Sequence, residues 1–111
     1  MKKYLYHITD SVYWQEAQRS GEYRHPSLDT DGFIHCSYEE QVEKVYQSFY
    51  AKESKDDLVL LKIDDAKVQS KVKLESDSRS GTQFPHIYGA FKLSAVKDVK
   101  RITQGSALKL R

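Results

Sequence analysis

The alternation of hydrophobic and polar residues predicts strands at several places along the chain. Tyr4–Ile8 alternates and is rich in aromatic and β-branched residues, and Gly32–Cys36 predicts a second strand. Leu58–Ile63 is a nearly continuous apolar run, which is typical of a central strand buried on both faces. Val68–Leu74 alternates less regularly with lysines, as an edge strand does, and Val96–Ile102 predicts a last strand.

Two segments with apolar residues at helical spacing predict helices. Val12–Gln18 follows residues that favour helix N-caps and precedes Gly21, which is a typical C-terminal stop. Val42–Phe49 has the clearest helical spacing in the chain. Ser37 and Glu40 lie just before it at the spacing of a capping box, which predicts where this second helix begins.

The order of these elements predicts the fold class. The helices come early and the strands are spread along the chain, so the pattern favours an α+β fold over a regular βαβ alternation. The chain has 111 residues, and we expect a single domain over residues 1–111. Two polar stretches, Glu22–Asp31 and Glu75–Gln83, predict loops. The second lies directly before His86, where a loop can close over a bound ligand.

Charge is too evenly distributed along the chain to predict a nucleic-acid surface. Apolar residues make up 39% of the chain, charged residues make up 31%, and the formal net charge is +2. The most basic stretch, Lys97–Arg111, is interpreted as a solvated strand and tail, so no nucleic-acid partner is expected. No apolar run approaches the roughly 20 residues that span a bilayer, so no membrane partner is expected.

The cysteine content and the N-terminal sequence predict a cytoplasmic protein. Cys36 is the single cysteine, so no internal disulfide can form. The first residues, MKKYLYHITDS, lack the apolar stretch of a signal peptide. Cys36 also follows His35, but adjacent residues of a strand face opposite ways, so we interpret this cysteine as a small buried side chain rather than a nucleophile.

His7, His35 and His86 are each followed, two residues later, by a hydroxyl-bearing side chain. Residues i and i+2 of a strand share a face, so each segment presents an imidazole and a hydroxyl together. We expect the three pairs to converge on one pocket. The pairs are His7 with Thr9, His35 with Ser37, and His86 with Tyr88.

Imidazoles and hydroxyls together suit a polar, oxygen-rich ligand, because each group both donates and accepts hydrogen bonds. Four aromatic side chains offer flat surfaces on which a ring can stack, namely Tyr6, Trp14, Phe33 and Tyr88, and Arg24 can pair with a phosphate. His35 and His86 are the candidates for proton transfer. The sequence therefore favours a polar, oxygen-rich ligand.

Other interpretations of these residues stay open. A single half-buried histidine often only donates to a backbone carbonyl, and we assign that structural role to His25, which lies in a proline-containing loop. Three histidines can also hold a catalytic zinc, but no H-E-x-x-H or C-x-x-C spacing supports a site, so no metal ligand is assigned. Asp56-Asp57 and Asp64-Asp65 flank a strand and are interpreted as turn residues.

Six segments carry a family resemblance, and it covers nearly the whole chain. In order, they are YHIT at Tyr6–Thr9, W-x-x-A at Trp14–Ala17, GEYRHPSL at Gly21–Leu28, GFIHCS at Gly32–Ser37, DLVLLKID at Asp57–Asp64 and FPHIYG at Phe84–Gly89. Together they closely resemble the bacterial family called domain of unknown function 952. The resemblance implies an ADP-ribosyltransferase-like fold, a small split β-sheet with two main helices around a cleft that holds NAD.

The resemblance also implies roles for particular residues. His7-Ile8-Thr9 is similar to the first-strand motif that holds a ribose in that superfamily. Where the superfamily has a late catalytic glutamate, FPHIYG offers His86 and Tyr88, and Glu75 lies upstream beside the predicted loop. We therefore expect binding of NAD, ADP-ribose or a related nucleotide, with NAD as a substrate rather than a resident cofactor. Transfer or hydrolysis through His35 or His86 is open, and the alternatives are a non-catalytic protein-binding or regulatory module and a metal-dependent hydrolase.

Overall fold

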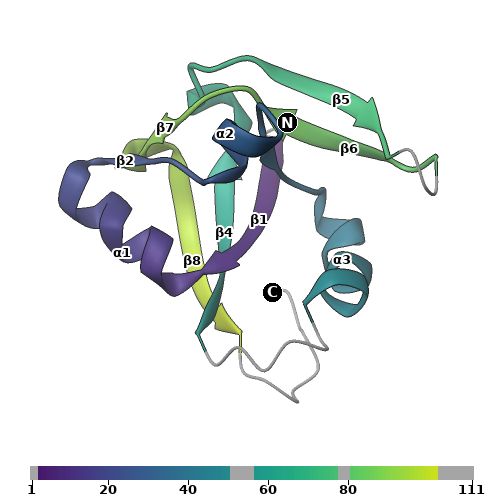
Figure 1. Ribbon diagram of the computed structural model, residues 1–111, viewed down its shortest axis with the longest axis horizontal. Helices are drawn as coiled ribbons and strands as arrows, with labels where there is room; N and C mark the ends of the chain where they lie inside the picture. The colour runs from purple at the N-terminus through teal and green to yellow at the C-terminus, as the bar shows by residue number, and fades with distance from the viewer. Residues whose placement is uncertain (1–2, 51–56, 78–80, 103–111) are drawn as a thin grey trace.

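The structure is a computed structural model, and it describes residues 3–50, 57–77 and 81–102 (Figure 1). The helices within these residues are α1 (Ser11–Ser20), α2 (Ser27–Thr30) and α3 (Val42–Phe49). The strands are β1 (Tyr4–Asp10), β2 (Glu22–Tyr23), β3 (Ile34–His35), β4 (Leu58–Asp64), β5 (Val72–Ser76), β6 (Gln83–Ile87), β7 (Phe91–Lys92) and β8 (Val96–Ile102). The fold is therefore α+β with small sheets, as the sequence predicts.

The largest strands form an antiparallel sheet in the order β1-β4-β8. The apolar run of β4 lies in its middle and is buried along most of its length, which confirms the predicted central strand. Figure 1 shows α1 and α3 on opposite sides of this sheet. Both faces of the sheet are consequently covered.

The alternation of β1 sorts its side chains into two separate hydrophobic clusters. Leu5 packs with Ala17 of α1 in one cluster. Tyr6 and Ile8 point the other way and pack with Val42 of α3 in the second cluster. This division matters for the site, because His7 shares the face of Leu5 and not that of Tyr6.

Two smaller sheets complete the described fold. One has the order β3-β6-β5, in which β6 pairs antiparallel with both neighbours. The other is the short pair β2-β7. An isolated bridge between Tyr6 and Ser37 joins β1 to the segment that follows β3. This bridge holds one edge of the β3-β6-β5 sheet against the main sheet.

The first predicted helix is present, and its ends have the expected chemistry. The Asp10 side chain accepts a hydrogen bond from the Val12 amide at 3.2 Å, so Asp10 is the N-cap. Gly21 ends the helix with φ at 89°, and its amide donates to the Ala17 carbonyl at 2.7 Å. A glycine adopts this left-handed conformation without a side-chain clash.

The predicted start of the second long helix is wrong by one residue. The Tyr38 amide donates to Gln41 Oε1 at 2.9 Å, and a 3₁₀ turn at Glu39–Gln41 precedes α3. Ser37 is not the cap, because its backbone is bonded to Tyr6 in the bridge to β1. The pairing of Ser37 with β1 therefore prevents it from capping the helix, and Tyr38 takes the cap position instead.

Both predicted loops contain regular structure. Glu22–Asp31 includes β2 and α2. Within Glu75–Gln83, Glu75 and Ser76 belong to β5, and Gln83 begins β6. Pairing with β6 overrides the polar composition of this segment, as strand context often does. No helix of the described residues is long and apolar enough to cross a membrane.

Candidate functional site

One face of the β3-β6-β5 sheet carries most of the predicted site residues. His86 of β6 lies opposite His35 of β3 on one side and Lys73 of β5 on the other. Residues opposite each other in antiparallel strands share a face, so these three side chains point the same way. Ile34 and Ile87 point the other way, into the core. The register therefore presents the two imidazoles on the side of the sheet away from that core.

The rings on this face lie in contact with one another. Phe33 stacks on His86, with 3.9 Å between ring centroids and an angle of 14° between ring planes. His35 lies edge-on to His86 at 5.4 Å, and Phe33 is 5.3 Å from Tyr88. The structure thus brings together Phe33, His35, His86 and Tyr88, all of which the sequence nominates.

Glu75 of β5 connects two of these residues through one carboxylate oxygen. Glu75 Oε1 accepts a hydrogen bond from His86 Nδ1 at 2.8 Å, and it also accepts one from the Tyr88 hydroxyl. The hydrogen bond from Tyr88, and then that from His86, lowers the pKa of Glu75. The same contact with Glu75 raises the pKa of the Tyr88 phenol. Glu75 is therefore an ionised acceptor at neutral pH.

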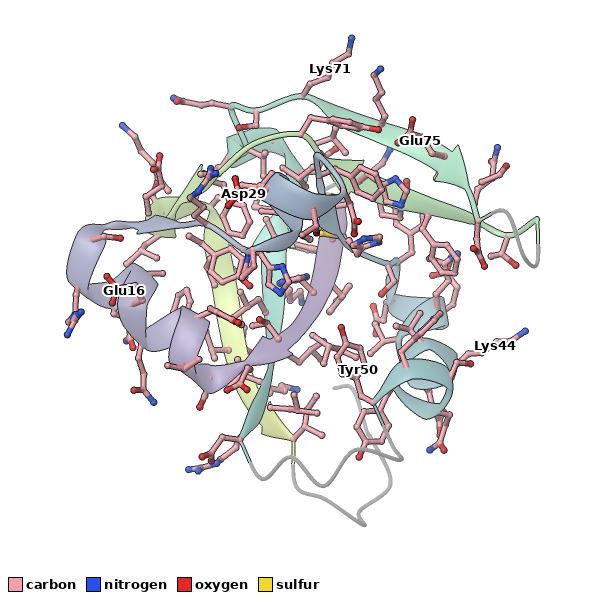
Figure 2. All side chains as sticks on the ribbon, in the orientation of Figure 1. Glu16, Asp29, Lys44, Tyr50, Lys71 and Glu75 are labelled. Carbon is pink, nitrogen blue, oxygen red and sulfur yellow. The ribbon has the colours of Figure 1, made fainter. Side chains whose placement is uncertain are left out.

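This acceptor fixes the tautomer of a neutral His86. A carboxylate has no hydrogen to donate, so Nδ1 of His86 must carry the hydrogen in the contact with Glu75. The lone pair then lies on Nε2. The predicted loop Glu75–Gln83 includes Glu75, and that bound is wrong because β5 holds Glu75 opposite Phe84. Figure 2 shows Glu75 on the β5-β6 hairpin.

Two further polar groups of the site are also hydrogen-bonded to a carboxylate. His35 Nε2 lies 2.7 Å from Asp31 Oδ2, and this contact lowers the pKa of Asp31. The Tyr6 hydroxyl donates to Glu39 Oε1 at 3.4 Å. Burial first, and then the charge of Glu39, raises the pKa of Tyr6. Each of these groups therefore has negative charge behind it.

A cavity of about 560 Å³ lies next to these groups, within the size range of small-molecule sites. Its lining comes from β1, the β3 and β5-β6 segments, α3 and the residue that follows α3. The lining residues are Tyr6, Ile8, Phe33, His35, Cys36, Ser37, Val45, Phe49, Tyr50, Ser76, Asp77, Phe84 and His86. The walls are mainly aromatic and aliphatic, with two imidazoles among them.

His7 lies on the opposite side of β1 and does not line this cavity. It is 3% exposed, and its Nδ1 lies 2.6 Å from the His35 carbonyl oxygen. Its Nε2 lies 2.7 Å from the hydroxyl of Tyr23, which is 2.9 Å from Thr9 Oγ1. The expected convergence of His7, His35 and His86 on one pocket is therefore wrong, because strand alternation separates His7 from the other two.

The hydrogen bonds of His7 belong to a continuous series of donors and acceptors, which runs from Thr9 through Tyr23 and His7 to the His35 carbonyl. Burial is the main cause that lowers the pKa of His7 to about 3, so the ring is neutral. A carbonyl only accepts, so Nδ1 donates to His35 and Nε2 accepts from the Tyr23 hydroxyl. The Tyr23 oxygen is then left to accept from Thr9. These contacts fit the structural interpretation of a buried histidine.

The remaining predicted residues are distributed as follows. Arg24 pairs with the exposed Asp29 at 2.7 Å and is not among the lining residues. Ser37 lines the cavity, although its hydroxyl lies 3.5 Å from the Tyr6 carbonyl. His25, expected to be structural, accepts from the Ser27 amide at 3.0 Å, and its ring is 5.3 Å from that of His7.

Two other kinds of site, a metal site and a reactive thiol, were considered for the described residues. Within residues 3–50, 57–77 and 81–102, no group of three or more His, Cys, Asp or Glu side chains is placed to hold a metal ion. Cys36 is buried, and burial raises the pKa of its thiol, which stays protonated. The interpretation of Cys36 as a small buried side chain is confirmed.

Sequence reasoning missed the residues that complete the site. The sequence assigns no role to Glu75, Val45 or Phe49, although Val45 and Phe49 line the cavity, and it names Tyr6 only as a stacking surface. A signal for Glu75 was present, because pairing its segment with FPHIYG as a hairpin places Glu75 and His86 on one face. Tyr6 follows from alternation, because it faces opposite to His7.

These features define a class of protein, a small α+β domain with an imidazole-bearing sheet face beside an aromatic cavity. The model of the family described as "Protein of unknown function (DUF952)" matches residues 8–99, and the chain belongs to this family. The comparison with curated proteins gives no significant match.

Solved structures of one bacterial protein are similar to this chain. The crystal structure of protein CC0527 from Caulobacter crescentus has a TM-score of 0.79 and 27% identity, and the match covers 94% of this chain and 90% of that one. The solution NMR structure of the same protein has a TM-score of 0.69 and 25% identity, with 90% and 84% covered. These similarities agree with the α+β architecture.

Proposed function

We propose that the cavity binds the nucleoside part of a nucleotide-type ligand, such as NAD or ADP-ribose, and that His86 transfers a proton there. The observation that carries this proposal is the Glu75–His86 pair. His86 lines the cavity, while its Nδ1 donates to Glu75 at 2.8 Å. A carboxylate in this position orients an imidazole and stabilises the imidazolium that forms when the other nitrogen takes a proton.

The walls of the cavity support binding of a planar ring. Phe33, Tyr6 and Phe84 line it together with Phe49 and Tyr50 near the end of α3. Aromatic walls bury a flat ring favourably, and a few polar groups then fix its orientation. Ser37 and His35 supply hydrogen-bonding groups at the same wall.

The ADP-ribosyltransferase-like fold and activity that the sequence resemblance implies are part of this proposal. Bond cleavage at a ribose passes through a positively charged, oxocarbenium-like transition state, which nearby negative charge stabilises. Glu75 supplies a carboxylate beside FPHIYG, whose own sequence has none. A cytoplasmic setting is also proposed, on the basis of the single cysteine.

The phosphates of such a ligand belong outside the cavity. Among the described residues that line it, none is a lysine or an arginine. Arg24, the expected phosphate partner, is paired with Asp29 away from this lining. A ligand with phosphates therefore has to enter with its nucleoside end first.

A titration followed by NMR tests this proposal. Isotopically labelled protein is titrated with NAD, ADP-ribose and adenosine, while backbone amides and histidine rings are observed. We expect saturable shifts at His35, His86 and α3, with smaller shifts at His25, which lies outside the cavity lining. Release of nicotinamide from NAD, lost in His86→Gln and kept in His25→Gln, tests the chemistry. No shift at millimolar ligand overturns the proposal.

A non-catalytic binding module is a second candidate, and one observation favours it. A smaller pocket of about 290 Å³ adjoins the cavity and shares Val45, Phe49, Asp77 and Phe84 with it. An elongated occupant, such as a peptide side chain with its flanking backbone, would fit such a continuous groove. Saturable binding with no turnover over a wide pH range would favour this candidate.

A further inference from the structure

We infer that the cavity selects a ring that carries a positive charge, as an N-alkylated heteroaromatic cation does. This inference rests on the proposed function and narrows it, because it names the charge of the ring that the aromatic walls hold. Its basis is the combination of three features of one cavity: carboxylates behind its polar groups, aromatic walls, and a lining without lysine or arginine among the described residues.

Carboxylates stand behind polar side chains from three different strands. Three polar side chains that line the cavity each contact a different carboxylate. These contacts are Tyr6 with Glu39 at 3.4 Å, His35 with Asp31 at 2.7 Å, and His86 with Glu75 at 2.8 Å. The lining side chains Tyr6, His35 and His86 come from β1, β3 and β6, respectively. A cation in the cavity is therefore attracted by more than one carboxylate.

The aromatic walls act in the same sense as these carboxylates. The face of an aromatic ring carries partial negative charge, so a cation over it is stabilised by about 0.5–2 kcal/mol, depending on desolvation. Five aromatic side chains line the cavity, namely Tyr6, Phe33, Phe49, Tyr50 and Phe84. A neutral ring gains the dispersion and burial terms from these walls but not the electrostatic term.

The described lysines and arginines lie outside the lining. Lys73 lies over the Tyr88 ring, 5.2 Å from its centroid, and Tyr88 is not a lining residue. Lys44 of α3 lines the smaller neighbouring pocket, and Figure 2 shows the Lys44 side chain pointing away from the body of the fold. Both lysines weaken the negative electrostatic potential in the cavity, but neither lines it, so neither would contact a bound cation.

A matched pair of probes tests the charge directly. 1-Methylnicotinamide is a planar cation, and 3-methylbenzamide is its neutral analogue of nearly the same shape. We expect the cation to bind about fivefold or more tightly, since charge–ring and charge–carboxylate attraction act only on it. The advantage should shrink as salt is raised. Dissociation constants from NMR titrations give the comparison.

Three outcomes are distinguishable. Tighter binding of the cation, with shifts at Phe33 and His86, supports the inference. Equal binding of both probes, or tighter binding of the neutral one, overturns the inference while the proposed function stands. Binding of neither probe at millimolar concentration overturns ring binding in this cavity, and with it both proposals.

Charge variants locate the attraction. Glu39→Gln and Asp31→Asn each remove a charge but keep an oxygen acceptor, and each should weaken binding of the cation about two- to fivefold. Binding of 3-methylbenzamide should not change. The matched control is Glu16→Gln, an exposed carboxylate on α1 that pairs with Arg19 at 2.6 Å. Equal effects of all three variants would overturn the local origin of the preference.

Discussion

Glu75 accepts the Nδ1 hydrogen of His86 across the β5-β6 pair, with 2.8 Å between the two atoms. Glu75 lies opposite Phe84 in the register, so it reaches His86 diagonally on the same face of the sheet. Because the contact joins two strands of one hairpin, the imidazole is positioned by regular structure and not by a loop. This is the geometry from which the proposed proton transfer is argued.

The first prediction concerns the hydroxyl that shares this carboxylate. The Tyr88 hydrogen bond is the largest cause of the lowered pKa of Glu75. Tyr88→Phe should therefore raise the pKa of Glu75 towards its ordinary value, while His86 keeps its own hydrogen bond to the carboxylate. Carboxyl-carbon NMR during a pH titration measures this pKa. Tyr38→Phe is the control, because the described hydrogen-bond partners of Glu75 are His86 and Tyr88. An unchanged Glu75 pKa in Tyr88→Phe would contradict the assignment.

The second prediction separates His7 from His86. His7 is buried and hydrogen-bonded at both ring nitrogens, so His7→Ala leaves a cavity and unpaired partners in the core. We expect a loss of about 2–4 kcal/mol in the free energy of unfolding, measured with urea. His86→Ala should cost less and should remove ligand binding. A His7→Ala variant with unchanged stability and no ligand binding would instead return His7 to the site.

The third prediction is a loss of stability in acid that originates from His7. Its pKa is lowered from 6.5 to about 3, mainly by burial, so between these values the unfolded chain binds a proton that the folded chain does not. Stability is therefore complete above pH 6.5 and falls as the pH decreases towards 3. The slope approaches about 1.4 kcal/mol per pH unit for one such group.

Urea unfolding at fixed ionic strength between pH 7 and pH 4 measures this slope. His7→Gln removes the titrating ring, so it should flatten the profile over that window even though the variant is less stable. Asp31→Asn is a useful comparison, because the pKa of Asp31 is lowered by His35 and its contribution is lost at lower pH. A profile that is equally steep in His7→Gln would assign the proton uptake to another group.

The sequence is sufficient to predict elements whose signal is local. Val12–Gln18 and Val42–Phe49 have helical spacing, and Leu58–Ile63 is apolar throughout, and each is present with nearly the expected bounds. The chemistry of helix ends is also local, which is why Gly21 could be assigned as a stop. The capping box at Ser37 failed because a distant strand, β1, uses the same backbone.

Predicting the site required the register between strands, which a single sequence does not contain. Alternation correctly pairs His7 with Thr9 and His86 with Tyr88. It does not say which faces of different strands meet. His35 and His86 meet because β3 and β6 are neighbours, whereas β1 turns Tyr6 and not His7 towards the cavity. Glu75 was missed for the same reason, because only pairing with β6 brings it to His86.

The last prediction tests whether the cavity itself is the binding site. Val45 of α3 lines it and is half-buried, so Val45→Trp places a large ring in the space without removing a buried polar contact. We expect this variant to stay folded and to lose saturable NMR shifts with NAD and with both ring probes. Glu43→Trp adds the same ring to an exposed position of the same helix and is the matched control. If Val45→Trp binds as the unmodified protein does, the ligand lies elsewhere, and the buried cluster around His7 and Tyr23 becomes the next region to test.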